Sequence, residues 1–98
     1  MAKLTGAEIE QALRGLAGWT REGDAIRRQF TFASFPDAVA FVGRLAFDAE
    51  AADHHPDIAI NYKRVTLTYS THSEGGLTQK DVDGARTADA LAARLSRS

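Results

Sequence analysis

The stretch that decides the fold covers residues 57–72 and reads DIAINYKRVTLTYSTH. Its second half, residues 65–72, alternates apolar and polar side chains, which is typical of a strand with one buried face. Val65, Leu67 and Tyr69 take one face, and Thr66, Thr68, Ser70 and His72 take the other. Ile58 and Ile60 alternate in the same way, and residues 62–64 can form a turn. The stretch therefore predicts two adjacent antiparallel strands, with His72 at the end of the second one.

A second pair of strands is predicted nearer the N-terminus, over residues 19–22 and 25–32. They are joined at Gly23-Asp24, and Ile26, Phe30 and Phe32 share one face of the longer strand. Arg28 interrupts that face, so we expect this strand to lie at an edge of the sheet or to direct its charge to solvent.

Three helices separate and flank these pairs. The first begins with Thr5 as cap and Glu8 at the third helical position, and Gly18 stops it. The second begins at Ser34 and should end around His54, because Pro56 disfavours helical geometry at His55. The third repeats the capping pattern with Thr78 and Asp81 and runs from Asp81 to about Leu95.

The second helix carries a broad apolar stripe, which we expect to pack on the sheet: Phe35, Ala38, Val39, Val42, Leu45, Ala46 and Ala49. Phe41 and Phe47 lie off this stripe. A chain of this size has few layers to cover both sides of a sheet, so the two phenylalanines indicate a homo-oligomer.

The order helix, two strands, helix, two strands, helix predicts an α+β fold, αββαββα. We expect one domain over residues 1–98, with a four-stranded antiparallel sheet and three helices on one of its faces.

Composition excludes several classes of function. The 98 residues are 44% hydrophobic and 26% charged, and the net charge of -1 gives no electrostatic footprint for nucleic acid. There is no cysteine, so disulfides and thiolate chemistry are excluded. No apolar run is long enough to span a membrane, and no signal peptide is recognisable, so we expect a soluble cytoplasmic protein.

All three histidines, His54, His55 and His72, fall in one stretch, and Glu50 precedes the first by one helical turn. Imidazole exchanges protons near neutral pH, so this grouping indicates proton-transfer chemistry. Gly43, Phe47, Glu50 and His54 share one sector of a helix, which is either a solvated edge or, as we favour, a pocket wall. Asp81 is a capping acid first and a site residue second.

The pattern Glu50-x3-His54-His55-Pro56-x5-Tyr62-x9-His72-x8-Asp81 closely resembles the signature of the pterin-4a-carbinolamine dehydratases. Ser70-Thr71-His72 and Gly76-Leu77 add to the resemblance. It implies the αββαββα fold and assembly as dimers or tetramers. It also implies dehydration of the 4a-hydroxytetrahydropterin left by an aromatic amino-acid hydroxylase, giving the quinonoid dihydropterin.

The resemblance also implies roles for single residues. His54 and His72 resemble the general acids toward the two faces of the pterin, and His55 resembles the residue for binding and base work. Glu50 could orient His54 or hold its charge. Glu50, Ser70, Thr71 and Asp81 are the expected substrate-binding residues. No nicotinamide, flavin or metal cofactor is expected, because no electrons move between molecules. Ile58 stands where many relatives have an aromatic residue, which bears on the specificity for the pterin side chain.

Two other classes of function remain open from the sequence. Three histidines, with Glu50, could hold zinc or iron, although His54 and His55 leave the chain in different directions. The chain could also be a non-catalytic binding protein, since an animal relative serves as a dimerisation cofactor for a homeodomain transcription factor.

Overall fold

The computed structural model of the protein describes residues 2–95. Its elements follow the predicted order: α1 (Gly6–Leu13), β1 (Thr20–Glu22), β2 (Ala25–Thr31), α2 (Phe35–Ala52), β3 (Asp57–Asn61), β4 (Arg64–Tyr69), the short 3-10 helix η1 (His72–Glu74) and α3 (Gln79–Leu95). Among these residues, no helix combines the length and the apolar content that crossing a membrane requires.

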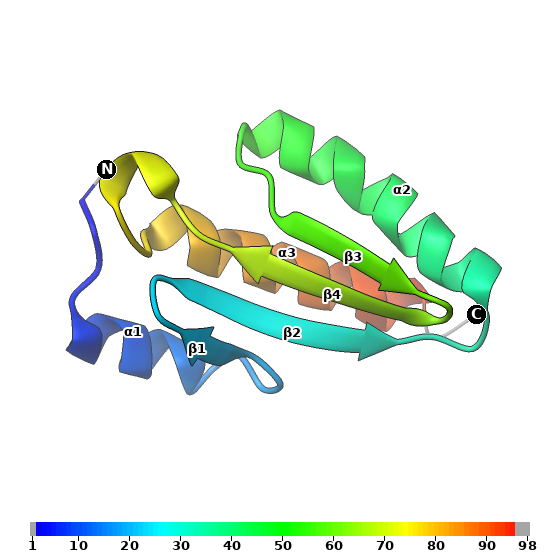
Figure 1. The fold of residues 1–98 in the computed structure, drawn as a ribbon, viewed down its shortest axis with the longest axis horizontal. Helices are drawn as coiled ribbons and strands as arrows, with labels where there is room; N and C mark the ends of the chain where they lie inside the picture. Colours follow the sequence, from blue (N-terminus) through cyan, green and yellow to red (C-terminus); the bar gives the residue numbers. More distant parts are fainter. Residues whose placement is uncertain (1, 96–98) are drawn as a thin grey trace.

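The four strands form one antiparallel sheet in the order β1-β2-β4-β3 (Figure 1). β4 pairs with both its neighbours, so that Val65 lies between Phe30 and Ile60, and Leu67 lies between Arg28 and Ile58. The apolar face of the sheet shares a single core with Ile9 of α1, Leu45 of α2 and Val82 of α3. The predicted α+β fold, with three helices on one face of the sheet, is confirmed.

The other face of the sheet is polar. Arg27, Thr68 and Asp57 form one cross-strand row, and Gln29, Thr66 and Ala59 form the next. The two threonines are half-buried and the others are exposed. The polar half of each alternating strand therefore faces away from the helices, as the period-2 pattern requires.

The helix starts agree with the capping signals. Thr5 and Glu8 form the reciprocal capping box of α1, and the Ser34 hydroxyl accepts the N–H of Asp37 at the start of α2. The helix ends differ from prediction. α1 ends at Leu13 rather than near Gly18, because Gly15 and Leu16 bond to the third carbonyl back in tighter turns. α2 ends at Ala52, where Asp53 takes a left-handed conformation with φ 51°.

The predicted buried stripe of α2 is partly wrong. Phe41 is fully buried, together with Ala38, Leu45 and Ala49, whereas Phe35 and Val39 are 50% and 43% exposed. The helix packs against α3 as well as the sheet, and this double contact turns the side of Phe41 inward. Phe47 is 72% exposed.

Arg28 does not mark an edge strand, because β2 lies between β1 and β4. The side chain points toward the helices, where its guanidinium donates to Asp89 Oδ1 of α3 at 2.8 Å and lies 4.4 Å from the centre of the Phe30 ring. Trp19 Nε1 donates to the same carboxylate oxygen at 2.9 Å. The charge in the apolar face is therefore paired rather than directed to solvent.

The strand predicted to reach His72 ends three residues earlier. β4 stops at Tyr69, and Thr71 pairs with Gly76 across an isolated bridge. The intervening residues fold back as η1, which Gly75 closes at φ 71°. His72 is therefore the first residue of a tight turn rather than the end of a strand.

Tyr69 is the innermost aromatic residue at this end of the sheet, and it is 2% exposed. Its ring lies 5.9 Å from that of Trp19. Burial, followed by the charges of Asp81 and Asp48, raises the pKa of the Tyr69 hydroxyl to about 12. The hydroxyl is consequently neutral at every physiological pH.

This raised pKa predicts a loss of stability in alkali. An unfolded tyrosine ionises with a pKa of about 10. Stability is therefore unaffected below that pH and falls as the pH rises toward 12, by up to about 2 kcal/mol in the free energy of unfolding. Urea unfolding at pH 9 and pH 11.5 measures this loss. It should shrink in Tyr69→Phe but persist in Tyr62→Phe, which alters an exposed tyrosine. Equal losses in wild type and Tyr69→Phe would contradict the prediction.

Candidate active site

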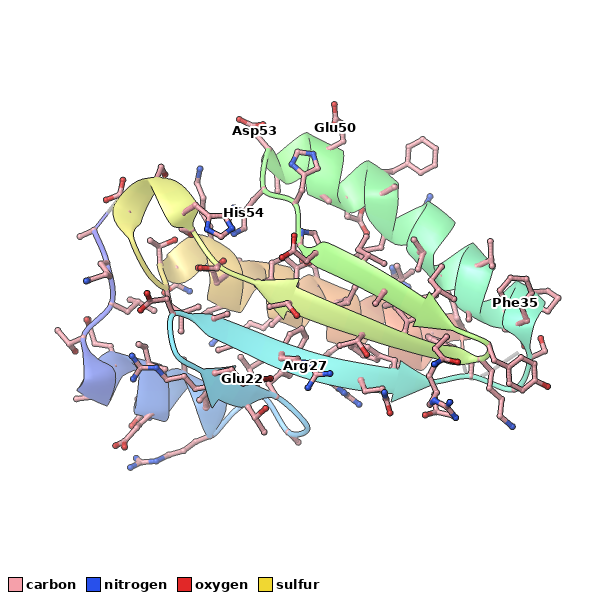
Figure 2. The ribbon with its side chains drawn as sticks, viewed as in Figure 1. Glu22, Arg27, Phe35, Glu50, Asp53 and His54 are labelled. Atoms are coloured by element: carbon pink, nitrogen blue, oxygen red, sulfur yellow. The ribbon has the colours of Figure 1, made fainter. Side chains whose placement is uncertain are left out.

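The three histidines lie at one end of the sheet. His54 and His55 occupy the connection from α2 to β3, and His72 opens η1 just beyond β4. Because Asp57 at the start of β3 pairs with Thr68 near the end of β4, both segments meet at this end. Figure 2 shows His54 pointing from this connection toward the end of the sheet where η1 lies.

His54 is paired with a buried carboxylate. Its Nε2 lies 2.6 Å from Asp81 Oδ1, and the two side chains are 12% and 0% exposed. Asp81 Oδ2 accepts two further hydrogen bonds, from the Thr71 hydroxyl at 2.8 Å and from the Thr78 N–H at 2.9 Å. One carboxylate therefore caps α3, as predicted, and holds His54 as well.

The direction of the hydrogen bonds around Asp81 fixes the proton on His54. Lys80 N–H donates to the Thr78 hydroxyl, which lies 2.9 Å from the Thr71 hydroxyl. Since Thr71 donates its own proton to Asp81, Thr78 must be the donor to Thr71. A carboxylate in its ionised form only accepts hydrogen bonds, so with Asp81 in that form His54 Nε2 is the nitrogen that carries a proton.

This assignment leaves Nδ1 as the chemically available atom of His54. Among residues 2–95, no group forms a hydrogen bond with it. When the ring is protonated, Nδ1–H can donate a proton to a ligand while Asp81 stabilises the imidazolium through Nε2. This arrangement is chemically suited to proton donation through Nδ1.

Glu50 binds His55 rather than His54. Its Oε1 lies 2.8 Å from His55 Nε2, and the side chains of Glu50 and His55 are 82% and 55% exposed. The prediction that Glu50 orients His54 is therefore wrong. It assumed that the helix continues to His54, whereas the left-handed turn at Asp53 directs His54 toward Asp81.

The remaining predicted residues differ in accessibility. The His72 side chain is exposed. The Ser70 hydroxyl donates to the Asp24 carbonyl at 2.7 Å and so joins β4 to the β1–β2 turn. Thr71 and Asp81 are buried in the network beneath His54. Asp81 therefore presents no free carboxylate to a ligand, because it is fully buried and its Oδ1 is bonded to His54.

A pocket of about 200 Å³ lies between α2 and α3 and reaches His54. Its polar lining includes Asp48, Lys80 and Asp83, and Tyr69 lies against His54 in its wall. None of these four residues was predicted from the sequence as a neighbour of the site. The only signal for Tyr69 was its place in the buried face of β4, close in sequence to His72.

The geometry gives no support to a three-histidine metal site. Within the described part of the chain, which includes all three histidines, no three His, Asp or Glu side chains are grouped so that they could hold a metal ion. His54 and His55 each bind a different carboxylate instead.

Comparison with known proteins points to the same family as the histidine motif. The sequence model of the family described as Pterin 4 alpha carbinolamine dehydratase matches residues 2–91. Relatives named pterin-4-alpha-carbinolamine dehydratase occur in Roseiflexus sp. (strain RS-1) and in Mycobacteroides abscessus. Each is 55% identical over 89 residues, which cover 91% of this chain and 96% and 95% of those proteins.

Two solved structures share the fold. The crystal structure of a transcriptional coactivator/pterin dehydratase from Brucella melitensis has a TM-score of 0.89 at 42% identity, covering 92% of this chain and 98% of that one. A pterin dehydratase-like protein that is a RuBisCO assembly factor in the alpha-carboxysome has a TM-score of 0.64 at 25% identity, covering 76% and 86%. From the family match, the close relatives and the shared fold, we conclude that this chain belongs to the pterin-4-alpha-carbinolamine dehydratase family.

Proposed function

We propose that the protein dehydrates a 4a-hydroxytetrahydropterin to the quinonoid dihydropterin and water. The observation that carries this proposal is the pairing of His54 with buried Asp81, which leaves Nδ1 available as an acid at the end of the sheet that also carries His55 and His72. The names of the relatives support the choice of a pterin as substrate.

The reaction needs one proton given and one taken. The bond from C4a to the hydroxyl oxygen breaks, and the oxygen leaves as water after it receives a proton. N5 loses its proton, and its electrons form the double bond to C4a. The substrate is neither oxidised nor reduced overall, so the chain's own acids and bases suffice.

Each histidine has a role that fits its surroundings. His54 donates through Nδ1 to a hydroxyl on one face of the pterin, and Asp81 stabilises the charged ring. His72, exposed on η1, is the acid toward the other face. His55, held by Glu50, binds the ring and accepts the proton from N5.

The wider setting follows from the substrate. A 4a-hydroxytetrahydropterin is formed when an aromatic amino-acid hydroxylase uses tetrahydropterin, so the reaction would serve the recycling of tetrahydrobiopterin in the cytoplasm. A hydroxylase is therefore the expected metabolic partner.

A direct assay tests this function. Purified protein, treated with chelator, should accelerate the dehydration of synthetic 4a-hydroxytetrahydropterin, followed by the absorbance of the quinonoid product. A variant with His54, His55 and His72 all changed to alanine is the control and should return the rate to background. Activity that appears only when metal is restored would replace this mechanism with a metal-dependent one.

The two-face scheme predicts a division between stereoisomers of the 4a-alcohol. His54→Ala should slow one isomer and His72→Ala the other, each by about 10²–10⁴-fold, while His55→Ala slows both. Rates measured on each separated isomer test this division between His54 and His72. Equal losses for both isomers in both single variants would remove the support for two acids.

The Asp81–His54 and Glu50–His55 pairs predict which histidine each carboxylate supports. Asp81→Asn should slow the same isomer as His54→Ala, and the double variant should lose little more than either single one, since both remove one unit. Glu50→Gln should instead be non-additive with His55→Ala and additive with His54→Ala. Double-mutant cycles in kcat measure this, and coupling of Glu50 to His54 would contradict the observed geometry.

We also propose that the protein is a homodimer or a homotetramer. Phe35, Val39 and Phe47 are exposed along the outer side of α2, and Ile58 and Ile60 are each 40% exposed on β3, an edge strand. An edge strand offers unpaired backbone groups, and apolar side chains flank this one.

A substitution on the exposed outer side of α2 tests whether the protein assembles. Light scattering at micromolar concentration should give a multiple of the 10.6 kDa chain mass, and Phe47→Glu should reduce it. Gln29→Glu, which changes the exposed polar face of the sheet, is the matched control and should not. A monomer mass for the wild-type protein would contradict the proposal.

A further inference from the structure

His54 makes a second contact, with a residue that the scheme above does not use. Its ring stacks on that of Tyr69, with the centroids 5.9 Å apart and the planes inclined by 23°. Tyr69 is the last residue of β4 and is buried, whereas His54 belongs to the connection after α2. The contact therefore joins the rigid sheet to a loop that carries a proposed acid.

The hydrogen bond to Asp81 does not by itself fix His54. It restrains Nε2, but a hydrogen bond tolerates some tilt and the torsion between Cβ and an aromatic ring is broad, so the imidazole can still make small rotations about that bond. A flat ring beside the imidazole limits these rotations, because larger ones would bring the two rings into collision. Asp81 thus restrains Nε2, and Tyr69 narrows the remaining range of ring tilts and so the direction of Nδ1.

Tyr69 also packs closely against α3. A Cβ atom added at Gly84 would lie 2.5 Å from Cε1 and 2.8 Å from Cζ of the tyrosine ring, which is closer than such atoms approach. Trp19 contacts the same ring at 5.9 Å. Only glycine at position 84 leaves room for the tyrosine ring where it lies against His54.

We propose that Tyr69 is a positioning residue for His54, and that Gly84 is the partner that makes this position possible. The proposal rests on the function proposed above, because it assigns His54 the role of an acid. The ring of Tyr69 carries the effect, and its hydroxyl does not. Asp48, Lys80 and Asp83 line the adjoining pocket but do not bind His54.

Four variants test this proposal. Tyr69→Leu should lower kcat for the isomer that depends on His54 by about 10- to 100-fold, with little change in KM or in the other isomer. Tyr69→Phe keeps the ring and should restore most of the rate. Gly84→Ala should also lower this kcat, although alanine is the better helix former. Phe30→Leu is the matched control, since Phe30 lies in the same core without contacting His54, and it should lower stability alone.

A double variant separates positioning from packing. In Tyr69→Leu the space beside Gly84 is empty, so adding Gly84→Ala should raise the unfolding temperature instead of lowering it. The rate should stay low, because the refilled core still lacks a ring against His54. Recovery of the rate together with stability would show that Tyr69 acts only through packing and would overturn the proposal.

A spectroscopic measurement keeps the test independent of catalysis. The proton on His54 Nε2, bonded to buried Asp81, should exchange slowly with water and be visible by NMR in wild type, Tyr69→Phe and Phe30→Leu. It should exchange faster in Tyr69→Leu. If the wild-type protein dehydrates no pterin but this pattern holds, the proposed function fails and the positioning by Tyr69 stands. If the proton is equally protected in all four proteins, the positioning role is wrong.

Discussion

The carboxylate of Asp81 is the group on which the rest of the site depends. It is fully buried and accepts hydrogen bonds from three segments: the start of α3, Thr71 beyond β4, and His54 beyond α2. A buried charge without partners would cost several kcal/mol, so these donors must be present together. This end of the protein is consequently one unit. The cap of α3, Thr71 after β4 and the imidazole of His54 all bind the same carboxylate.

This arrangement explains why the adjacent histidines His54 and His55 differ in exposure and in hydrogen-bond partner. His54 is sheltered and bound to a buried acid, while His55 is exposed and bound to the exposed Glu50. The left-handed residue Asp53 separates them from the helix and lets their side chains diverge. Two imidazoles that are neighbours in sequence thus obtain different surroundings, which fits the different roles proposed for them.

The fold around this site is shared by proteins with other roles. One structure with the same fold is a RuBisCO assembly factor, so the fold alone does not carry the activity. The buried Asp81–His54 pair, on which the proposed acid depends, is a more specific observation than the topology. The exposed outer side of α2 and the open edge at β3 are separate from it, which leaves these surfaces available for assembly.

The sequence by itself determined the order of the elements, the helix starts and the two hairpins, because capping and alternation act over only a few residues. It also determined the motif that indicates the family. The tertiary structure decided which groups meet across longer separations. Asp81 is 27 residues from His54, so no local pattern could choose it over Glu50. The burial of Phe41 instead of Phe35 depends on how α2 rotates against α3 and the sheet, and the pairing of Arg28 depends on Asp89, 61 residues away. Local periodicity predicts which residues share a face, but only packing against other elements decides where that face points.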